Sequence, residues 1–463
     1  MSAEGLRACK EKMAAAGVHR AAIATFRHLY EQLEAGETGL IPEDSIVPIE
    51  SVPASADLPA SADPAGVLDQ AVVLKLNGGL GTSMGMSGPK SLLPVKDGLT
   101  FLDVIVRQVL DLRARHGARL PLVLMNSFYT REESLSALTR YEDVAADVPL
   151  DFVQNKEPKL RADDLHPVSW PADPDLEWCP PGHGDLYTAL VTSGMLAALL
   201  DRGYRYAFVS NSDNLGAVLE PRILAWFAAE EIPFLMEVAD RTEADRKGGH
   251  LAARASDDRL VLREIAQTPE GDRDAFQDVG RHRFFNTNTL WIDLRALAAT
   301  LEARDDVLGL PMIVNRKTVD PADPGSPPVV QLETAMGAAI SVFEGARALR
   351  VPRERFAPVK TTNDLLALRS DCYELTPDAR VVPVPGRDGG APLVDLDPAH
   401  FKLLGDFEAR FPAGAPSLVD CSRLVVKGDV TFGADVVARG DVTVAAGDGP
   451  RRIADGTVLQ GAS

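Results

Sequence analysis

The sequence predicts an α/β protein with a mostly parallel central sheet, followed by a C-terminal left-handed parallel β-helix. Short apolar runs of the kind that form buried strands alternate with longer segments whose apolar residues recur at helical spacing. Near the end of the chain this rhythm gives way to a repeat of six residues. At 463 residues the chain exceeds one ordinary hydrophobic core, so we expect two or three domains.

Four apolar runs predict the core strands: "AVVLKL" from residue 71, "LPLVLMN" from 120, "YRYAFVSN" from 204 and "IPFLMEVA" from 232. The predicted helices lie between them: "TFLDVIVRQVLDLRARHG" from 100, "TREESLSALTRY" from 130 and "PRILAWFAAEE" from 221. Thr130 followed by Glu133 fits a capping box, which supports a helix start at that point. Alternation of this kind is typical of a mostly parallel sheet.

Two shifts in composition predict the domain boundaries. Residues 1–65 form an N-terminal helical segment and linker, because apolar residues recur at helical spacing up to residue 39 and the stretch from 51 to 70 is rich in Pro, Ala, Ser and Asp. Residues 66–378 hold the α/β domain, and residues 379–463 hold the β-helix domain.

The tail aligns in sixes over residues 427–444 as "KGDVTF", "GADVVA" and "RGDVTV", with Val430, Val436 and Val442 in register. One aliphatic residue per repeat, with small or polar corners, is how a parallel β-helix fills its narrow interior. A chance run of strand-like alternation is the alternative. No histidine follows His400 to serve as the base of an acyltransferase, so we expect a structural tail or an assembly surface that could hold a homo-oligomer together.

Composition excludes several classes of protein. A formal net charge of -19 repels phosphate polymers, so nucleic acid is not expected as the main partner, although a small anion suits a local group of lysines. The absence of an apolar run of transmembrane or signal-peptide type predicts a cytoplasmic protein with no membrane anchor. The cysteines lie far apart without a C-x-x-C pair, which predicts reduced structural thiols: Cys9, Cys179, Cys372 and Cys421.

A glycine-rich stretch, "LNGGLGTSMGMSGPKS" from Leu76 to Ser91, follows the first core strand. Backbone N–H groups in such a turn can cradle a nucleotide or phosphate. The dinucleotide pattern G-x-G-x-x-G fails because its third glycine would fall on Met84, and G-x-x-x-x-G-K-[ST] fails because Lys90 follows Pro89. From this stretch alone, a phosphate site and a simple tight turn remain equally open.

The stretch resembles the nucleotide loop of the eukaryotic-type UTP:glucose-1-phosphate uridylyltransferases, or UDP-glucose pyrophosphorylases. Further segments resemble that family in the expected order: "FVQNKEPKL", "PPGHGDLYTAL", "SNSDNLGA", "RKGGHL", "EIAQTP", "FFNTNTLW", "QLETAMGAAI" and "VPRERFAPVKTTNDLL". The resemblance covers nearly all of residues 70 to 370. It implies a Rossmann-like, GT-A-like nucleotidyltransferase domain, which the hexapeptide tail also suits.

The family's reaction joins UTP and glucose 1-phosphate to give UDP-glucose and pyrophosphate. The sugar phosphate attacks the α-phosphorus in line, without a covalent enzyme intermediate. Because two polyanions must be aligned, cations and Mg²⁺ should dominate catalysis. The resemblance implies that Lys360 is the principal catalytic cation, that Lys90 binds phosphate, and that Asp213 at a strand end holds Mg²⁺. Without the resemblance, surface lysines and an Asx turn would explain these three residues.

The resemblance also assigns the substrate contacts. The nucleotide would meet Leu76, Asn77, Gly78, Gly79, Lys90, Gln154, Gly182, Asn211, Ser212, Asp213 and Lys360. The sugar phosphate would meet His183, Gly249, Glu264, Asn286 and Asn288. A side-chain amide such as that of Gln154 can read the edge of uracil, since it offers both a donor and an acceptor. Thr289 departs from the asparagine expected after Asn288.

Two alternatives remain. A UDP-N-acetylhexosamine or broad UDP-sugar pyrophosphorylase would share the fold and the uridine site, but would carry a loop closer to L-A-G-G-Q-G-T-R, where this chain has Asn77, Leu80 and Ser83. A catalytically silent nucleotide-sugar sensor would keep the pocket alone. Intact Lys90, Asp213 and Lys360 favour the enzyme.

Overall fold

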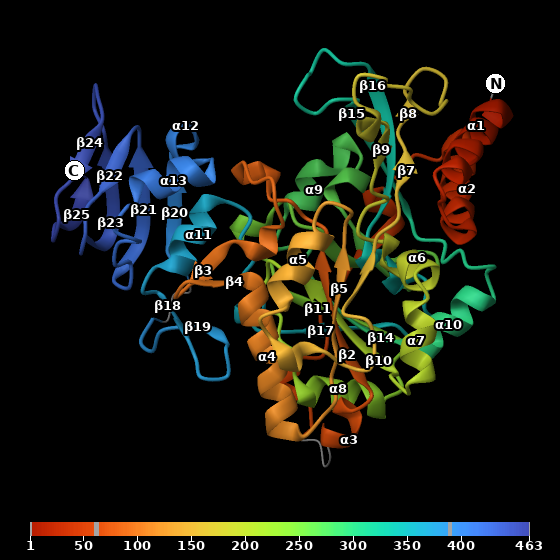
Figure 1. Cartoon of the computed structure of the whole chain (residues 1–463), viewed down its shortest axis with the longest axis horizontal. Coiled ribbons are helices and arrows are strands. Elements are labelled where there is room, and N and C mark those ends of the chain that lie inside the picture. The colour runs from red at the N-terminus through yellow and green to blue at the C-terminus, as the bar shows by residue number, and fades with distance from the viewer. Residues whose placement is uncertain (1, 60–63, 388–390, 463) are drawn as a thin grey trace.

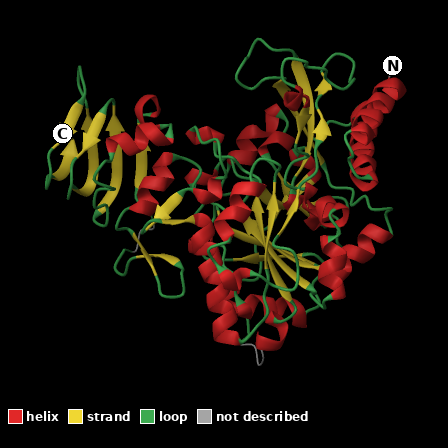
Figure 2. Ribbon diagram, in the orientation of Figure 1, coloured by secondary structure: helices red, strands yellow, loops and turns green. Residues whose placement is uncertain are grey.

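The computed structural model describes residues 2–59, 64–387 and 391–462. Within these residues the chain forms a large central sheet with helices on both sides and a smaller group of parallel strands at the C-terminal end (Figure 1). The ribbon in Figure 2 shows the central strands enclosed by helices, with the C-terminal strands set apart from them. The α/β class predicted from the sequence is confirmed.

The parallel part of the central sheet consists of four strands in the order β10-β2-β5-β6. Their bounds are β2 (Ala71–Asn77), β5 (Leu122–Asn126), β6 (Asp151–Val153) and β10 (Tyr206–Asn211). β2, β5 and β10 coincide with predicted apolar runs. Since all four run the same way, their carboxyl ends meet along one edge, where open α/β sheets bind ligands.

An antiparallel part adjoins β10 through the long strand β14 (Phe284–Asp293), which pairs with both β10 and β11 (Phe234–Asp240). β11 also pairs in parallel with β17 (Arg347–Arg350). A branch of three strands continues from β14: β12 (His250–Arg254), β13 (Leu260–Arg263) and β1 (Ile46–Pro48). The sheet is therefore mixed, and its four adjacent parallel strands lie at the glycine loop.

Burial on both faces explains the continuous apolar run of β2. Its Val73 belongs to one hydrophobic cluster and its Val72 and Leu74 to another, as alternation of side chains across a strand requires. The first cluster packs against α4 (Phe101–His116) and α8 (Pro221–Ala229). The second packs against α6 (Asp185–Thr192), α7 (Met195–Asp201) and α10 (Leu294–Glu302).

The capping pattern predicted at Thr130 is wrong, although α5 (Arg131–Leu138) does begin there. The Thr130 hydroxyl accepts a hydrogen bond from the Ser127 backbone N–H at 2.9 Å and makes no cap bond to the helix. The preceding turn takes the hydroxyl because it is buried against that turn. A capping box does form at Thr100 and Asp103, where α4 begins.

The N-terminal segment contains two helices, α1 (Ser2–Ala15) and α2 (Arg20–Glu34). They pack beside a three-stranded sheet of β8 (Leu160–Arg161), β15 (Met312–Thr318) and β16 (Pro328–Thr334), near the pair formed by β7 (Glu157–Pro158) and β9 (Trp178–Cys179). Strand β1, from the same segment, pairs with β12 in the central sheet. Two further short helices are α3 (Pro64–Leu68), which contacts α8, and α9 (Arg273–Gln277).

The C-terminal strands pair in parallel, as the six-residue repeat predicts. β20 (Leu393–Leu396), β21 (Cys421–Lys427), β23 (Val437–Ala445) and β25 (Val458–Ala462) form one sheet, and β22 (Val430–Phe432) pairs with β24 (Arg451–Ile453). Val430, Val436 and Val442 are all buried, so the repeated aliphatic position does fill the interior. Helices α12 (Pro398–Phe401) and α13 (Leu404–Arg410) lie beside these strands.

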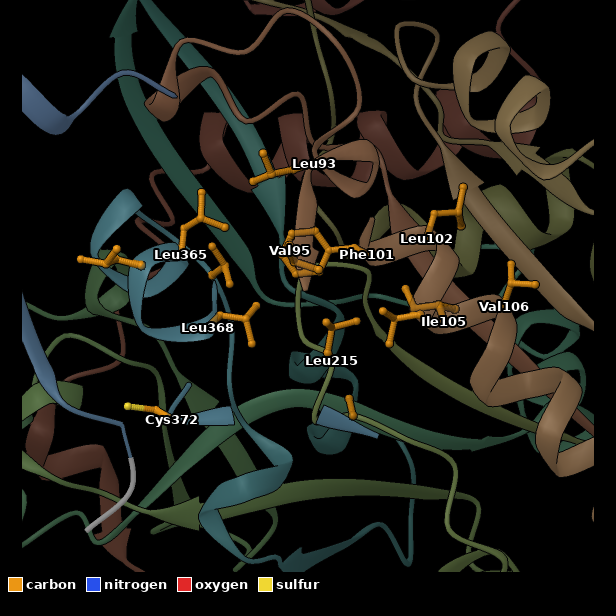
Figure 3. Packing of buried hydrophobic residues seen from close by; sticks show 14 of the residues in the cluster. Leu93, Val95, Phe101, Leu102, Ile105, Val106, Leu215, Leu365, Leu368 and Cys372 are labelled. Atoms are coloured by element: carbon orange, nitrogen blue, oxygen red, sulfur yellow. The ribbon is translucent and has the colours of Figure 1, made fainter. Parts of the chain in front are cut away.

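Between the two parts lie a hairpin of β3 (Pro94–Lys96) and β4 (Leu99–Thr100), helix α11 (Thr362–Arg369), and a hairpin of β18 (Tyr373–Leu375) and β19 (Val381–Pro383). The second hairpin spans the predicted boundary at residue 378, and the boundaries themselves stay predictions. Figure 3 shows the packing here, with Leu93 and Val95 near Leu365 and Leu368 of α11. One hydrophobic cluster thus extends from the central sheet to the C-terminal strands.

All four cysteines are buried and free, in keeping with the predicted structural thiols. Among the described residues, no helix combines the length and apolar character that a membrane crossing needs.

Candidate active site

A cavity of about 330 Å³ opens at the carboxyl ends of the parallel strands. Its lining consists of Leu76, Gly78, Gly79, Lys90, Met125, Gln154, Pro180, Gly182, His183, Asn211, Ser212 and Asp213. All but Met125 and Pro180 are site residues predicted from the sequence. Met125 lies near the end of β5, and Pro180 lies just before the "GHG" stretch. Their closeness in sequence to a strand end and to a family motif could have indicated that they belong to the site.

The glycine loop folds back so that its lysine returns to its beginning. Gly81 and Gly85 have φ of 63° and 73°, a left-handed conformation that glycine adopts without strain, and they flank a single 3₁₀ turn. The backbone N–H of Lys90 then donates to the carbonyl of Gly79 at 3.0 Å. This backbone course explains why neither of the two glycine patterns fits the sequence. In those patterns the loop leads directly into a helix, whereas here it folds back on itself before Lys90.

Lys90 and Asp213 form an ion pair at the cavity. The Lys90 Nζ donates to Asp213 Oδ2 at 2.7 Å, and the two side chains are 14% and 23% exposed. Asp213 follows β10 by two residues, so the fold brings the lysine of the glycine-rich stretch to a carboxylate at a strand end. The pair presents opposite charges to any phosphate that enters.

The segment that carries Lys360 is hydrogen-bonded to the backbone and side chain of the turn at Asp213 and Asn214. The N–H of Val359 donates to the Asp213 carbonyl at 3.2 Å, and the Asn214 side chain accepts from Ala357 N–H at 3.0 Å. The Lys360 side chain is exposed, with its Nζ 5.9 Å from the centre of the Phe356 ring. Asn214 was quoted in the sequence motif but not predicted as a site residue, and it fastens the segment that carries Lys360.

Four of the five residues predicted for the sugar phosphate lie together, and His183 lies apart from them in the cavity wall. Asn286 donates from its backbone to the Gly249 carbonyl at 2.9 Å and from its side chain to Asn288 Oδ1 at 2.9 Å. A Cβ on Gly249 would come within 2.5 Å of the Glu264 carboxyl group, so a larger residue there would displace that side chain. Burial raises the pKa of Glu264, and the charge of nearby Lys360 opposes that rise. Lys360 therefore stands near both Asp213 and this cluster.

A bulge between β11 and β14 exposes Asn288. The register moves from Glu237 opposite Thr289 to Val238 opposite Asn286, which leaves two residues of β14 out of the ladder. Asn288 takes a φ of 55°, a left-handed conformation that asparagine tolerates better than most residues. The neighbouring Thr289 is fully buried, and its hydroxyl has no hydrogen-bond partner among the described residues.

The other end of the cavity is built by Gln154 and the Gly182–His183 turn. Gln154 lies against the glycine loop, since a Cβ on Gly78 would be 3.0 Å from Gln154 Oε1. Gly182 has a φ of 79°, and a Cβ there would be 2.6 Å from the Thr334 carbonyl. Burial lowers the pKa of His183, and its Nδ1 accepts a hydrogen bond from Met336 N–H at 3.0 Å. His183 is thus a neutral wall residue.

Asn77 and Lys360 are the two predicted nucleotide residues that do not line the cavity, and the case of Asn77 is explained by its strand. The Asn77 side chain is buried, donates to Asn126 Oδ1 at 2.7 Å and Ser134 Oγ at 2.8 Å, and does not line the cavity. As the last residue of β2, it points away from the cavity that its neighbour Leu76 lines. Its side chain therefore supports the start of the loop from behind.

A metal ion at this site would have one carboxylate from the protein. No group of three or more His, Cys, Asp or Glu residues suited to a metal occurs among the residues that the structure describes. Mg²⁺ needs no such group, since it is commonly held by one or two carboxylates together with substrate phosphates and water. Asp213, partly exposed and facing the cavity, fits that kind of site.

An open α/β sheet whose strand ends gather a glycine-rich loop, lysines and a carboxylate defines a nucleotide-binding protein that handles phosphates. The comparison with known families narrows this class. Residues 23–439 match the family model described as UTP–glucose-1-phosphate uridylyltransferase, and the chain belongs to that family.

Similar proteins agree with this family. The UTP–glucose-1-phosphate uridylyltransferase of Solanum tuberosum is 44% identical over 391 residues, which are 84% of this chain and 80% of that protein. Among solved structures, a variant of the UDP-glucose pyrophosphorylase of Leishmania major in complex with UDP-glucose is 47% identical, with a TM-score of 0.94 over 99% of each chain. The Trypanosoma brucei protein named UDP-glucose phosphorylase is 48% identical, with a TM-score of 0.91 over 99% of this chain and 98% of that one.

Proposed function

We propose that this protein is a uridylyltransferase that makes UDP-glucose and pyrophosphate from UTP and glucose 1-phosphate, reversibly. Membership of the family and the named relatives support this function. The observation that carries it is the meeting of Lys90, Asp213 and the Lys360 segment between a Gln154 wall and the sugar cluster. A nucleotide and a sugar phosphate bound at these two ends would bring their phosphates to the lysines.

The reaction is a direct displacement at phosphorus. A phosphate oxygen of glucose 1-phosphate forms a bond to the α-phosphorus of UTP while the bond from that phosphorus to the pyrophosphate oxygen breaks. The nucleophile is already an anion, so no strong base is required. Lys90 and Lys360 lower the repulsion between the two anions and stabilise charge on the oxygens around phosphorus.

Asp213 is the residue that would hold Mg²⁺ in this mechanism. Mg²⁺ held there would supply positive charge that offsets the negative charge of the phosphates. In the structure the Asp213 carboxylate is paired with the Lys90 ammonium group. Asp213 would hold Mg²⁺ in place of this lysine, and Lys90 would contact the phosphates.

The experiment is a pyrophosphate-release assay with UTP, glucose 1-phosphate and Mg²⁺. We expect turnover by the wild-type protein and a loss of at least about a hundredfold in Lys360→Ala, the size of effect seen when one group that stabilises transition-state charge is removed. Lys10→Ala, which removes an exposed lysine from α1, serves as the control. Wild-type turnover in Lys360→Ala would refute the catalytic role of that residue.

A substrate panel separates the related functions. Much faster turnover of N-acetylglucosamine 1-phosphate than of glucose 1-phosphate would assign the protein to the hexosamine enzymes. Binding of UTP or UDP-glucose without any pyrophosphate release would make it a sensor. We expect neither result, because the sugar cluster and both lysines are present together.

Three further properties belong to the same proposal. The parallel C-terminal strands would coil with left-handed connections into a β-helix, as their repeat suggests. A homo-oligomer would use this region. A cytoplasmic location would suit four free, buried cysteines.

A further inference from the structure

Asp185 is a buried carboxylate that no part of the proposed mechanism uses. It is the first residue of α6 and is 4% exposed. Both of its oxygens accept hydrogen bonds from one residue: Asn155 donates its backbone N–H to Oδ2 at 2.6 Å and its side-chain amide to Oδ1 at 2.8 Å. We call these two bonds the Asp185–Asn155 clamp.

The clamp joins the two walls of the base end of the cavity. Asn155 directly follows Gln154, whose backbone N–H donates to Asn126 at 2.9 Å. Asp185 closes the turn that begins at Gly182, since its own N–H donates to the Gly182 carbonyl at 3.2 Å. Gln154, Gly182 and His183 all line the cavity, whereas Asp185 and Asn155 do not. The clamp therefore fixes the distance between Gln154 and the turn from behind.

The electrostatic setting of Asp185 is costly. Among the described residues it forms no ion pair, and burial raises its pKa to about 7, against the two bonds from Asn155 that lower it. The nearby Glu157 is also buried, and its own pKa is raised by burial and by the charge of Asp185. An asparagine at position 185 would avoid burying a charge, but would offer one acceptor where two donors converge. The pair of acceptors is thus the property that the position provides.

We propose that Asp185 is a positioning residue for recognition of the uracil base, acting through Asn155 on Gln154. This inference rests on the proposed function, in which Gln154 reads the base. An amide can turn over and present its donor and acceptor in either order. The amide distinguishes uracil from cytosine only if its position and orientation relative to the base are fixed. The Asp185–Asn155 clamp supplies that restraint.

The test compares Asp185→Asn with the wild-type protein for UTP, CTP and glucose 1-phosphate. We expect the KM for UTP to rise about tenfold, the size of one lost charge-assisted hydrogen bond, and the preference for UTP over CTP to fall. The KM for glucose 1-phosphate should stay within about twofold, since the sugar cluster has its own supports. In a Gln154→Leu background, Asp185→Asn should change the UTP preference no further.

Two variants control for a purely structural role. Asp103→Asn removes another buried carboxylate that accepts several hydrogen bonds, at the start of α4 and outside the cavity lining. It should lower the melting temperature and leave the KM for UTP unchanged. The exchange Asp185→Asn with Asn155→Asp restores two bonds, because the amide at 185 then accepts from the backbone and donates to the carboxylate at 155. This double variant should recover the UTP preference.

Several results would overturn the inference. One is a lowered melting temperature in Asp185→Asn with an unchanged KM for UTP and an unchanged preference for UTP over CTP. Another is that Asp185→Asn reduces this preference as much in the Gln154→Leu background as in the wild-type protein. If Asp185→Asn does not fold, Asn155→Ala replaces it, because this partly exposed position keeps its backbone bond. An unchanged KM for UTP in Asn155→Ala would likewise overturn it.

Failure of the proposed function would look different. A wild-type protein that released no pyrophosphate would refute that function, and calorimetric binding of UTP and CTP would then test the clamp on the same variants. Weaker UTP binding with a reduced preference over CTP in Asp185→Asn would support the clamp, and unchanged binding of both would refute it.

Discussion

Lys75 carries its ammonium group inside the central sheet, directly before the glycine-rich stretch that begins at Leu76. It is 2% exposed, and its Nζ donates to Ser210 Oγ at 2.6 Å and to the Ala217 carbonyl at 2.9 Å. Burial lowers the pKa of Lys75 to about 7, and the charge of Arg355 adds to that effect. The lysine thus links β2 to the end of β10, where Asn211 and Asp213 begin the site.

The lowered pKa of Lys75 makes folding stability depend on pH. Between about pH 7 and the ordinary lysine pKa near 10.5, the unfolded chain holds a proton that the folded chain has lost. The stability of the wild-type protein relative to Lys75→Met should therefore rise with pH, by up to about 1.4 kcal/mol per unit. Urea unfolding of both proteins at about pH 7.5 and 9.5 measures this difference. A difference that falls over the same range would contradict the pKa assignment.

Gly249 is a second residue whose role follows from local geometry. Gly249→Ala would bring a methyl group to within 2.5 Å of the Glu264 carboxyl group and displace it. We expect the KM for glucose 1-phosphate to rise between about tenfold and a hundredfold, with the KM for UTP nearly unchanged. Steady-state kinetics with each substrate varied provide the measurement. Gly271→Ala is the matched control, since nothing lies within 4 Å of a Cβ there, and equal kinetics in the two variants would count against this role.

At the scale of elements, the segment that carries Lys360 is fastened to the central sheet by a buried ion pair. Arg355 donates from Nε and Nη2 to the two carboxylate oxygens of Glu237 on β11, at 2.8 and 2.7 Å. The same Glu237 accepts from the Trp291 indole on β14 at 2.9 Å. Asn214 adds a bond to the Arg355 carbonyl at 3.1 Å. The loop is therefore anchored a few residues before Lys360, the proposed catalytic lysine.

Arg355→Lys should reduce kcat by about tenfold or more, because a lysine keeps the charge but cannot form the two-bond fork. It should also lower stability, by an amount approaching the roughly 3 kcal/mol that breaking a buried pair costs. Single-turnover kinetics and urea unfolding measure the two effects. Arg350→Lys is the control, since Arg350 is 43% exposed in its pair with Asp240. An unchanged kcat in Arg355→Lys would show that the anchor does not act on Lys360.

At the scale of the whole molecule, the two parts of the chain share one buried cluster. Val73 of the central sheet, Leu365 of α11 and Leu424 of β21 all belong to it. Figure 3 shows the middle of this cluster, where side chains of β3, α4 and α11 are drawn together. Because the cluster is continuous, the C-terminal strands and the central sheet should unfold together.

Val436→Asp tests this continuity, since Val436 is 1% exposed within the cluster. Burial of a carboxylate there should cost more than about 4 kcal/mol and lower the melting temperature of the whole protein in one transition. Differential scanning calorimetry, with far-UV circular dichroism, follows the transition. Val458→Asp, at a position 52% exposed on β25, should have little effect. Two separated transitions in Val436→Asp would show that the parts fold independently.

Local sequence patterns predicted helices and strands correctly where a pattern is compatible with one kind of secondary structure. The apolar runs at 71 and 120 became β2 and β5 because strands buried on both faces have no polar alternation. The capping pattern at Thr130 failed because a hydroxyl has more than one neighbour to bond, and the preceding turn was nearer. The bulge at Asn288 could not be predicted, since it depends on the register of β11 against β14.

For the site, the resemblance to the family supplied the residue set, and most of the predicted nucleotide residues do line one cavity. Asn77 shows the limit of that approach. A motif places a residue next to a site, but the side of the strand on which its side chain lies is decided by packing. The Asp185–Asn155 clamp was not predicted either, because neither residue lines the cavity.

By itself, the sequence determined the alternation of strands and helices, the six-residue repeat of the tail, and the family, together with a predicted set of residues for phosphate, base and sugar. Only the tertiary structure decided which of these residues touch. Lys90 and Asp213 are separated by 123 positions, and Gln108 bonds a carbonyl 271 positions away. Periodicity reports the local surroundings of ten or twenty residues, whereas such contacts depend on how the whole sheet is ordered and on which charges burial forces together.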